Sequence, residues 1–347
     1  MTAEYPKIEV FEKQRPVKGR TGLANKVAII GAFDTLETNP QVFLSLSNAQ
    51  TALGTDATYN GCKALPILFG TGSCLAVNIT TENEGTRDKT LTTAKLSSAL
   101  AKIKGEDFDL LYVADSLADD ALVIIDTFLK ETFKMKYPAG YIAGITRQNA
   151  SAYLTTAGLA GDHCYGLISQ NMTVNGENYD IIQSSAYYAH VIADLAVGNS
   201  MTMKQVPYVT AIEPEYTFET GDAGLSLVGA GLTILKCQDR GSSKYVVVNS
   251  EQPNGLDLYI NRVRDYVIKE MALHQFLGSR NRPATYEQIE QELDRVKYKC
   301  IDSLDLLEDI QFNIEKVDAN TVDVNITSMT FAGIITKINV YYSIEVE

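Results

Sequence analysis

The sequence predicts a layered α/β domain followed by a smaller α+β domain, with an extended arm containing a strand at each end. Apolar segments of strand length alternate with amphipathic helical segments between residues 26 and 146, which is typical of α/β layers. Two helical patterns and a pair of strand patterns follow residue 256. The final residues, TKINVYYSIEVE, alternate apolar and polar side chains, as a strand with one buried face does.

Four segments of the α/β region indicate strands that are covered on both faces. Each is apolar over most of its length and lacks the alternation of a half-exposed strand, so the segments predict a parallel sheet. They are KVAIIGAF (26–33), SCLAVNIT (73–80), FDLLYVAD (108–115) and GYIAGIT (140–146).

Helices are expected where apolar residues recur every three or four positions. In the α/β region these segments are 91–103, 119–133 and 184–197. Ser116 and Asp119 have the spacing of a helix-starting capping pair, and Gly198 is suited to end the third helix. Short apolar segments at 232–237 and 244–250 complete the region.

The C-terminal part begins with an amphipathic helix predicted over residues 256–278. Its expected apolar face consists of Leu256, Ile260, Val263, Val267 and Met271, and its polar face of Arg262, Asp265 and Lys269. Thr285 and Gln288 predict a capping box for a second helix. Strands over 311–317 and 321–327 follow, joined by a turn at 318–320. The predicted organisation is an arm (1–20), an α/β domain (21–238), an α+β domain (239–330) and a strand arm (331–347).

Composition narrows the class of protein. The chain is 45% hydrophobic and 21% charged, with no leader-like start and no run approaching the roughly 18 apolar residues of a membrane span, so we expect a soluble cytosolic product. The net charge of -13 and pI near 4.8 argue against nucleic-acid binding. Five scattered cysteines without a C-x-x-C pair predict reduced, mostly buried thiols rather than disulfides or a zinc site.

A search for catalytic chemistry yields no catalytic residue, no metal site and no cofactor. The first strand lacks a following G-x-G-x-x-G, and G-x-x-x-x-G-K-[ST], H-x-x-x-H and H-E-x-x-H are absent. Asp115 ends a predicted strand, where active-site groups often lie, but helix capping explains it equally well. Gly198-Asn199-Ser200-Met201 is similar to the nucleophile turn of subtilisin-type proteases, yet His190 lies one helix earlier and no triad can be assembled.

The two ends of the chain are the more informative features. The candidate N-terminal strand is Lys7, Ile8, Glu9, Val10 and Phe11, and the apolar side of the C-terminal strand is Ile338, Val340, Tyr342, Ile344 and Val346. Each strand can pair within its own domain or complete a sheet in another copy of the chain. The first twenty residues carry five basic and three acidic side chains, whereas residues 301–347 carry nine acidic and two basic ones, so copies joined end to beginning would attract weakly.

The order of these segments resembles that of contractile tail sheath proteins of myophages and R-type bacteriocins. The resemblance rests on the charged N-terminal arm, KVAIIGAF, the α/β region, LVGAGLTILK, VNSEQPNGLDLYINRVRDYVIKEM and the last strand, and it covers essentially the whole chain. Without large inserted outer domains, the chain is similar to compact, diffocin-like sheaths. The family's middle domain resembles a subtilisin fold without its triad, which implies the same topology here.

The resemblance implies a non-enzymatic structural subunit. Such subunits stack as hexameric rings in a helical polymer around an inner tail tube, and they meet baseplate and terminator or collar proteins without binding nucleic acid or inserting into a membrane. It also implies synthesis in the bacterial cytoplasm, release of the particle on lysis, and exchange of residues 7–11 and 338–346 between neighbours. The implied tube contact consists of Arg262, Arg264, Lys269, Arg280 and Arg282. The competing hypothesis is a cytosolic α/β enzyme with an appended oligomerisation domain and a ligand pocket.

Overall fold

The computed structural model describes residues 26–69, 72–134, 138–145, 161–239, 242–271, 273–276, 282–317 and 322–331. The chain divides into two compact units between Leu277 and Gly278, whereas the sequence pattern placed the domain boundary after residue 238. The difference arises because the segments just after 238 belong to the first unit: Tyr245, Val247 and Leu258 are all buried in its core.

The first unit is organised around a six-stranded sheet, most of it parallel as predicted. The strand order is β2-β3-β1-β6-β7-β8, and only the edge strand β2 runs antiparallel to its neighbour. The strands are β1 (Lys26–Gly31), β2 (Gln41–Phe43), β3 (Ser73–Asn78), β6 (Leu110–Leu117), β7 (Gly140–Ile145) and β8 (Cys164–Ile168). Four of them coincide with the four apolar segments of the sequence.

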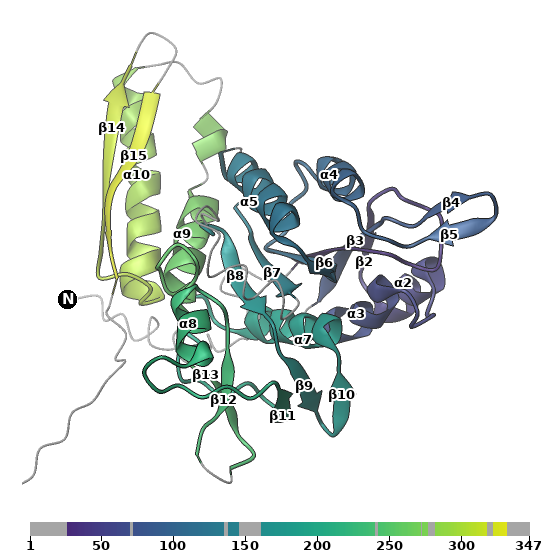
Figure 1. Cartoon of the computed structure of the whole chain (residues 1–347). Helices are drawn as coiled ribbons and strands as arrows, with labels where there is room; N and C mark the ends of the chain where they lie inside the picture. The colour runs from purple at the N-terminus through teal and green to yellow at the C-terminus, as the bar shows by residue number, and fades with distance from the viewer. Residues whose placement is uncertain are drawn as a thin grey trace, which may run out of the picture. The chain divides into compact units, whose positions relative to one another are not determined.

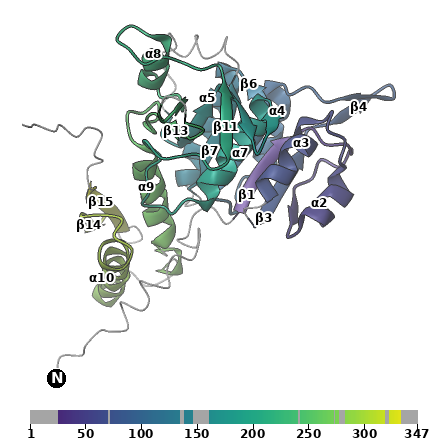
Figure 2. The ribbon, with the colours of Figure 1, turned by 90° about the horizontal axis from the view of Figure 1, so that it is seen from below.

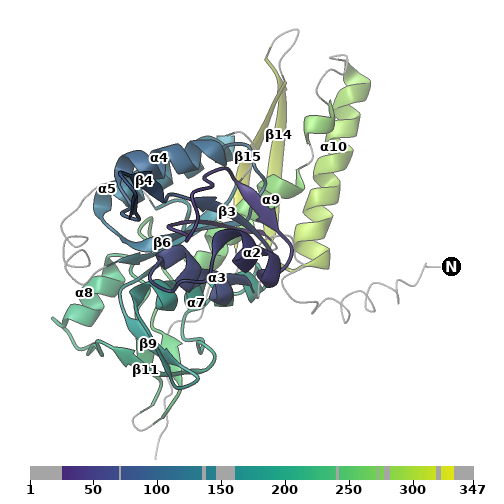
Figure 3. The same ribbon diagram turned by 90° about the vertical axis from the view of Figure 1, so that its right-hand side faces the viewer.

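Helices cover both faces of this sheet, which explains why its strands lack alternation. α4 and α5 lie on one face, and α3 and α7 lie on the other beside α2 (Figures 1 and 3). Their bounds are α2 (Leu46–Leu53), α3 (Asn60–Leu68), α4 (Thr93–Lys102), α5 (Asp119–Lys134) and α7 (Ile181–Asp194). The unit is therefore a three-layer α/β structure.

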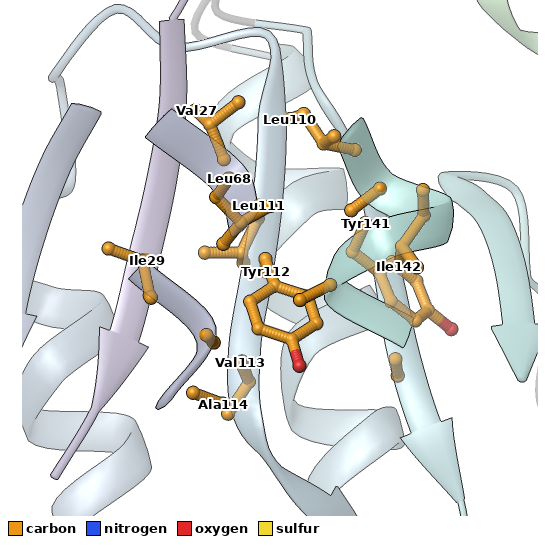
Figure 4. Packing of buried hydrophobic residues seen from close by; sticks show 14 of the residues in the cluster. Val27, Ile29, Leu68, Leu110, Leu111, Tyr112, Val113, Ala114, Tyr141 and Ile142 are labelled. Carbon is orange, nitrogen blue, oxygen red and sulfur yellow. The ribbon is translucent and has the colours of Figure 1, made fainter. Parts of the chain in front are cut away.

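The centre of the core lies around strands β1, β6 and β7. Side chains from these strands and from α3 fill the space between sheet and helices (Figure 4). Tyr112 of β6 is completely buried, and its hydroxyl donates to the carbonyl of Ile182 at 2.6 Å. This bond satisfies the phenol and ties the middle of the sheet to the first turn of α7.

Smaller elements complete the first unit. A polar hairpin of β4 (Thr81–Asn83) and β5 (Thr86–Asp88) extends from it (Figure 2). A three-stranded sheet and a two-stranded sheet follow the parallel strands. The remaining bounds are β9 (Asn171–Val174), β10 (Glu177–Tyr179), β11 (Val209–Glu213), α8 (Ala223–Gly229), β12 (Leu235–Cys237), β13 (Tyr245–Val247), α9 (Leu258–Glu270) and a 3₁₀ turn, η2 (Leu273–Phe276).

The second unit is a helix with a β-hairpin. α10 (Pro283–Tyr298) continues into a π-helical turn, η3 (Lys299–Ser303), and the hairpin consists of β14 (Asp309–Lys316) and β15 (Val322–Thr330). β14 and β15 run alongside α10 (Figures 1 and 3). The predicted hairpin is confirmed, and its predicted turn at 318–320 lies outside the described residues.

Three predicted helix caps are wrong. Ser116 lies inside β6, and α7 begins at a capping box of Asp180 and Gln183 and ends at Leu195 rather than at Gly198. Thr285 lies in the first turn of α10, which follows Arg282 and has Pro283 as its first residue. For α7 and α10 other residues take the terminal positions, namely Asp180, Leu195 and Arg282, and all three helices lie in the predicted parts of the sequence.

Gly140 provides a test of how tightly this core is packed. A Cβ at this position would overlap the ring of Tyr165, which cannot move easily because its hydroxyl donates to the buried Asp265 at 2.7 Å. We expect Gly140→Ala to lower the free energy of unfolding by about 2 kcal/mol. Gly229→Ala is the control, since a Cβ there meets nothing within 4 Å, and it should leave urea unfolding nearly unchanged. Equal midpoints for the two variants would contradict the described packing.

Candidate functional site

The hairpin of the second unit has one apolar and one polar face. Ile310 is fully buried, and Phe312 and Ile314 are half-buried, whereas the residues between them are exposed. In β15, Val324 and Ile326 are half-buried and Asn325 is exposed. This two-residue period follows from strand geometry and places the apolar side chains towards α10, whose Ile289, Leu293 and Val296 are buried.

Both long edges of this hairpin are open within the described part of the chain. There, β14 pairs only with β15, and β15 only with β14, in an antiparallel register that runs from Asp309 opposite Thr330 to Lys316 opposite Val322. The outer edges therefore carry main-chain N–H and C=O groups without a strand partner. A two-stranded sheet of this kind is marginal alone and is a template for an added strand.

A groove of about 500 Å³ follows the β14 edge beside α10. Its β14 side consists of residues 310–314, and its helical side consists of Glu290, Leu293, Asp294 and Lys297. The floor is apolar, since Leu293 and Ile310 are buried, and the flank is charged. A strand that bonded to β14 would therefore turn one set of side chains onto an apolar surface and run past charged groups of α10.

Some charged side chains around this groove have an ion-pair partner among the described residues and others have none. Lys297 pairs with Asp309 at 3.2 Å, and Gln311 donates to the same carboxylate at 3.0 Å. The bond from Gln311 and that from Lys297 lower the pKa of Asp309. Glu290 and Asp294 lie one helical turn apart, and within the described residues neither carboxylate has an ion-pair or hydrogen-bond partner. The groove thus presents two uncompensated negative charges, which we did not predict; their four-residue spacing around the inward-facing Leu293 is the sequence signal.

The two predicted donor strands cannot be placed. Lys7, Ile8, Glu9, Val10 and Phe11, and likewise Ile338, Val340, Tyr342, Ile344 and Val346, lie outside the described residues. Their exchange between copies stays a prediction.

The predicted basic face of α9 is not a free basic surface. Arg262 is 1% exposed and donates to the carbonyls of Leu195 and Ala196, at 2.7 and 3.1 Å, at the end of α7. Burial lowers its pKa to about 10. The expectation that Arg262 lies on a solvent-facing contact surface is therefore wrong: its guanidinium satisfies helix-end carbonyls that have no intrahelical partner.

The other members of the predicted set differ in their surroundings. Arg264 donates to Asp265 at 3.1 Å, and Lys269 forms ion pairs with Asp107 and Asp109, so both of these partly buried cations are neutralised within the first unit. Arg282 is exposed at the start of α10, and Arg280 lies outside the described residues. Of the three cations in the first unit, Arg262 is buried and Arg264 and Lys269 are ion-paired, so these three do not form a free basic cluster.

Ser200, the residue of the protease-like turn, belongs to a polar cluster at the start of α9. Asp257 is the N-cap of that helix and accepts hydrogen bonds from Ser200, Ser250 and Thr202 at 2.9, 2.6 and 3.1 Å. These bonds join the 199–202 loop to the helix. A cavity of about 490 Å³ has both His190 and Ser200 in its lining, but the Ser200 hydroxyl is bound to Asp257 and Ser250 rather than to a histidine.

The other residues considered for chemistry are Asp115, the metal-ligand types and the cysteines. Asp115 accepts from the backbone N–H of Ser116 at 2.8 Å, and burial raises its pKa. The described residues contain no group of three or more histidine, cysteine or acidic side chains placed to hold a metal ion. They also contain no helix with the length and apolar character needed to cross a membrane. All four cysteines of the first unit and Cys300 are free thiols.

Comparisons with known proteins place this fold among tail sheath proteins. No family model and no curated protein matches the sequence. The sheath tail protein of Desulfitobacterium hafniense matches the structure with a TM-score of 0.64 at 11% identity, over 90% of this chain and 98% of that one. A chain of the six-fold symmetrised anti-feeding prophage baseplate gives 0.66 at 12% identity over 94% of each chain. The contracted helical sheath of the anti-feeding prophage gives 0.65 at 13% identity over 93% of each.

Arg262 gives a direct test of the site assignments. Replacing it with alanine leaves a cavity and removes a hydrogen-bond donor from the carbonyls of Leu195 and Ala196, of which, among the described residues, only that of Ala196 keeps a backbone donor, Asn199. Arg262→Ala should therefore lower the free energy of unfolding by about 3 kcal/mol. Arg282→Ala removes an exposed side chain and should change it by less than about 0.5 kcal/mol. Urea unfolding followed by circular dichroism compares the two. A loss at Arg262 no larger than that at Arg282 would contradict its structural role.

Proposed function

We propose that this chain is the structural subunit of a contractile tail sheath, and that copies polymerise through strands added to the hairpin of the second unit. The fold likeness to tail sheath proteins, which extends over 90% or more of this chain, carries the proposal. The β14 and β15 edges, which have no strand partner among the described residues, support it independently, because a subunit that receives strands needs an unpaired sheet edge.

The physical basis of the link is main-chain hydrogen bonding. A strand of five residues adds about five hydrogen bonds, each with a net contribution of roughly 0.5–1.5 kcal/mol, together with the burial of isoleucine and valine side chains. We propose residues 7–11 and 338–346 as the donated strands. In this proposal such links tolerate rotation of the compact units, because the donated strands belong to the chain ends and not to the core of either unit.

Contraction in this proposal uses stored conformational free energy and no nucleotide. The extended polymer is kinetically trapped, and a trigger at a baseplate releases it into a more compact lattice that drives an inner tube through a target envelope. The subunit has no catalytic role in this scheme. The strand order β2-β3-β1-β6-β7-β8 and the engagement of Ser200 by Asp257 support a subtilisin-like topology without a triad.

The partners in the proposal are further copies in stacked six-membered rings, an inner tail tube, a baseplate and a terminator or collar. The particle is assembled in the bacterial cytoplasm and released on lysis. For the tube contact, Arg280 and Arg282 remain proposed residues. Arg264 and Lys269 can contribute only by exchanging acidic partners that they already hold.

Negative-stain electron microscopy of the purified chain tests this function. We expect hollow, striated cylinders from the full chain and none from a version that ends after Gly333, because the C-terminal strand is then missing. Circular dichroism must show that the truncated chain is folded, so that loss of cylinders is a loss of assembly. Discrete small particles from both versions would overturn the proposal and favour the enzyme hypothesis.

A further inference from the structure

The two uncompensated carboxylates beside β14 distinguish this edge from an ordinary open strand. We propose that the β14 groove selects the N-terminal arm of a second copy, and rejects the C-terminal arm, through the charges of Glu290 and Asp294. This inference rests on the proposed function, since it names which strand the acceptor edge takes.

Charge is the first argument. Among the described residues that line the groove, Lys297 is already paired with Asp309, while Glu290 and Asp294 are unpaired. The N-terminal strand is followed by the basic residues Lys13, Arg15, Lys18 and Arg20 and by only one acid, Glu12. Residues 337–347 carry Lys337 against Glu345 and Glu347. The groove therefore attracts the first arm and repels the second.

Size is the second argument. The groove is formed by five residues of β14, 310–314, and its buried floor is Ile310 and Leu293. The strand predicted at residues 7–11 has the same length, and the two-residue period of a strand would place Ile8 and Val10 on one side of it. The strand predicted at residues 338–346 is nine residues long, with five apolar residues in alternate positions, and is therefore longer than this groove.

Reach permits the contact. β1 begins at Lys26, so fourteen residues separate it from Phe11. An extended chain of that length spans about 45 Å, which is enough to leave its own α/β unit and reach another copy.

Photo-crosslinking identifies the occupant. A photo-reactive phenylalanine analogue is placed at position 313, whose native Asn313 is exposed and lines the groove. Cylinders are assembled from a mixture of this variant and an isotope-labelled wild-type chain, irradiated and digested. We expect crosslinked peptides from residues 1–20 of the labelled chain. Peptides from residues 332–347, or no crosslink between copies within intact cylinders, would overturn the inference.

Charge reversal then tests the selecting residues. Glu290→Lys with Asp294→Lys should lower the yield of the N-terminal crosslink about threefold at low salt, the effect expected of exposed ion pairs, and less in high salt. Glu287→Lys with Asp302→Lys is the matched control, because both residues are exposed acids outside the groove. Adding Lys13→Glu and Arg15→Glu to the donor should restore the yield. If the crosslink yield fell no further than in the control variant, or if the donor substitutions did not restore it, Glu290 and Asp294 would not be the selecting residues.

The outcomes distinguish a failure of the arm assignment from a failure of the proposed sheath function. If wild-type chains form no cylinders, the sheath proposal fails and the acceptor assignment fails with it. If cylinders form and position 313 crosslinks to the C-terminal arm, the sheath proposal stands and only the charge selection is wrong.

Discussion

The larger unit depends on one constraint: its central strands must be buried on both faces. Val27, Ile29 and Val113 are almost inaccessible, and helices on either side of the sheet supply the packing surface. Burying apolar surface contributes a favourable free energy of folding of roughly 25 cal/mol per Å². Parallel strands require crossover connections, so the helices that provide this cover are also the links between the strands.

Polar groups buried in that unit serve to hold its last helix. Three side chains of α9 and its N-cap bind it to the core. Arg262 donates to the carbonyls of Leu195 and Ala196 at the end of α7, and Asp265 accepts a hydrogen bond from Tyr165 of β8. Asp257 accepts hydrogen bonds from the hydroxyls of Ser200 and Ser250, which lie in two loops. Each bond satisfies a group that would otherwise be costly to bury. A helix that looks amphipathic in sequence is thus anchored by its polar side as well as by its apolar side. The same residues cannot also serve as a free basic surface.

The second unit has the opposite character. Its described residues form α10, the turn η3 and two strands, a small set of elements with a small core, and within them both sheet edges remain open. Open edges are usually protected by charge or covered by other elements, because they invite unwanted pairing. Here the charged residues of β14 lie at its two ends, Asp309 and Glu315–Lys316, whereas Glu290 and Asp294 of α10 lie beside its middle. The main chain between the ends stays accessible, and an incoming strand meets the two carboxylates of α10.

Local patterns in the sequence determined four strands of the large sheet, helices α4, α5, α7, α9 and α10, and the layered class, but they did not predict β2, β8, α2 or α3. Continuous apolar segments such as KVAIIGAF need no tertiary information to be identified as buried strands, and the alternation in residues 311–327 is enough to predict the hairpin. The order of segments was also enough to indicate a tail sheath fold, which the structural likeness confirms.

The tertiary structure decided what charged and polar residues do, because their roles depend on neighbours distant in sequence. Arg262 and Lys269 have the spacing of a solvated helix face, yet one lies inside the protein and the other is paired with acids more than 150 residues earlier. The observed helix caps and the observed end of the first unit differ from the predicted ones for the same reason. Several residues were locally suitable, and tertiary packing decided which of them took the position. The groove beside β14 could not be derived from sequence at all, because its two walls come from separate elements that only folding brings together.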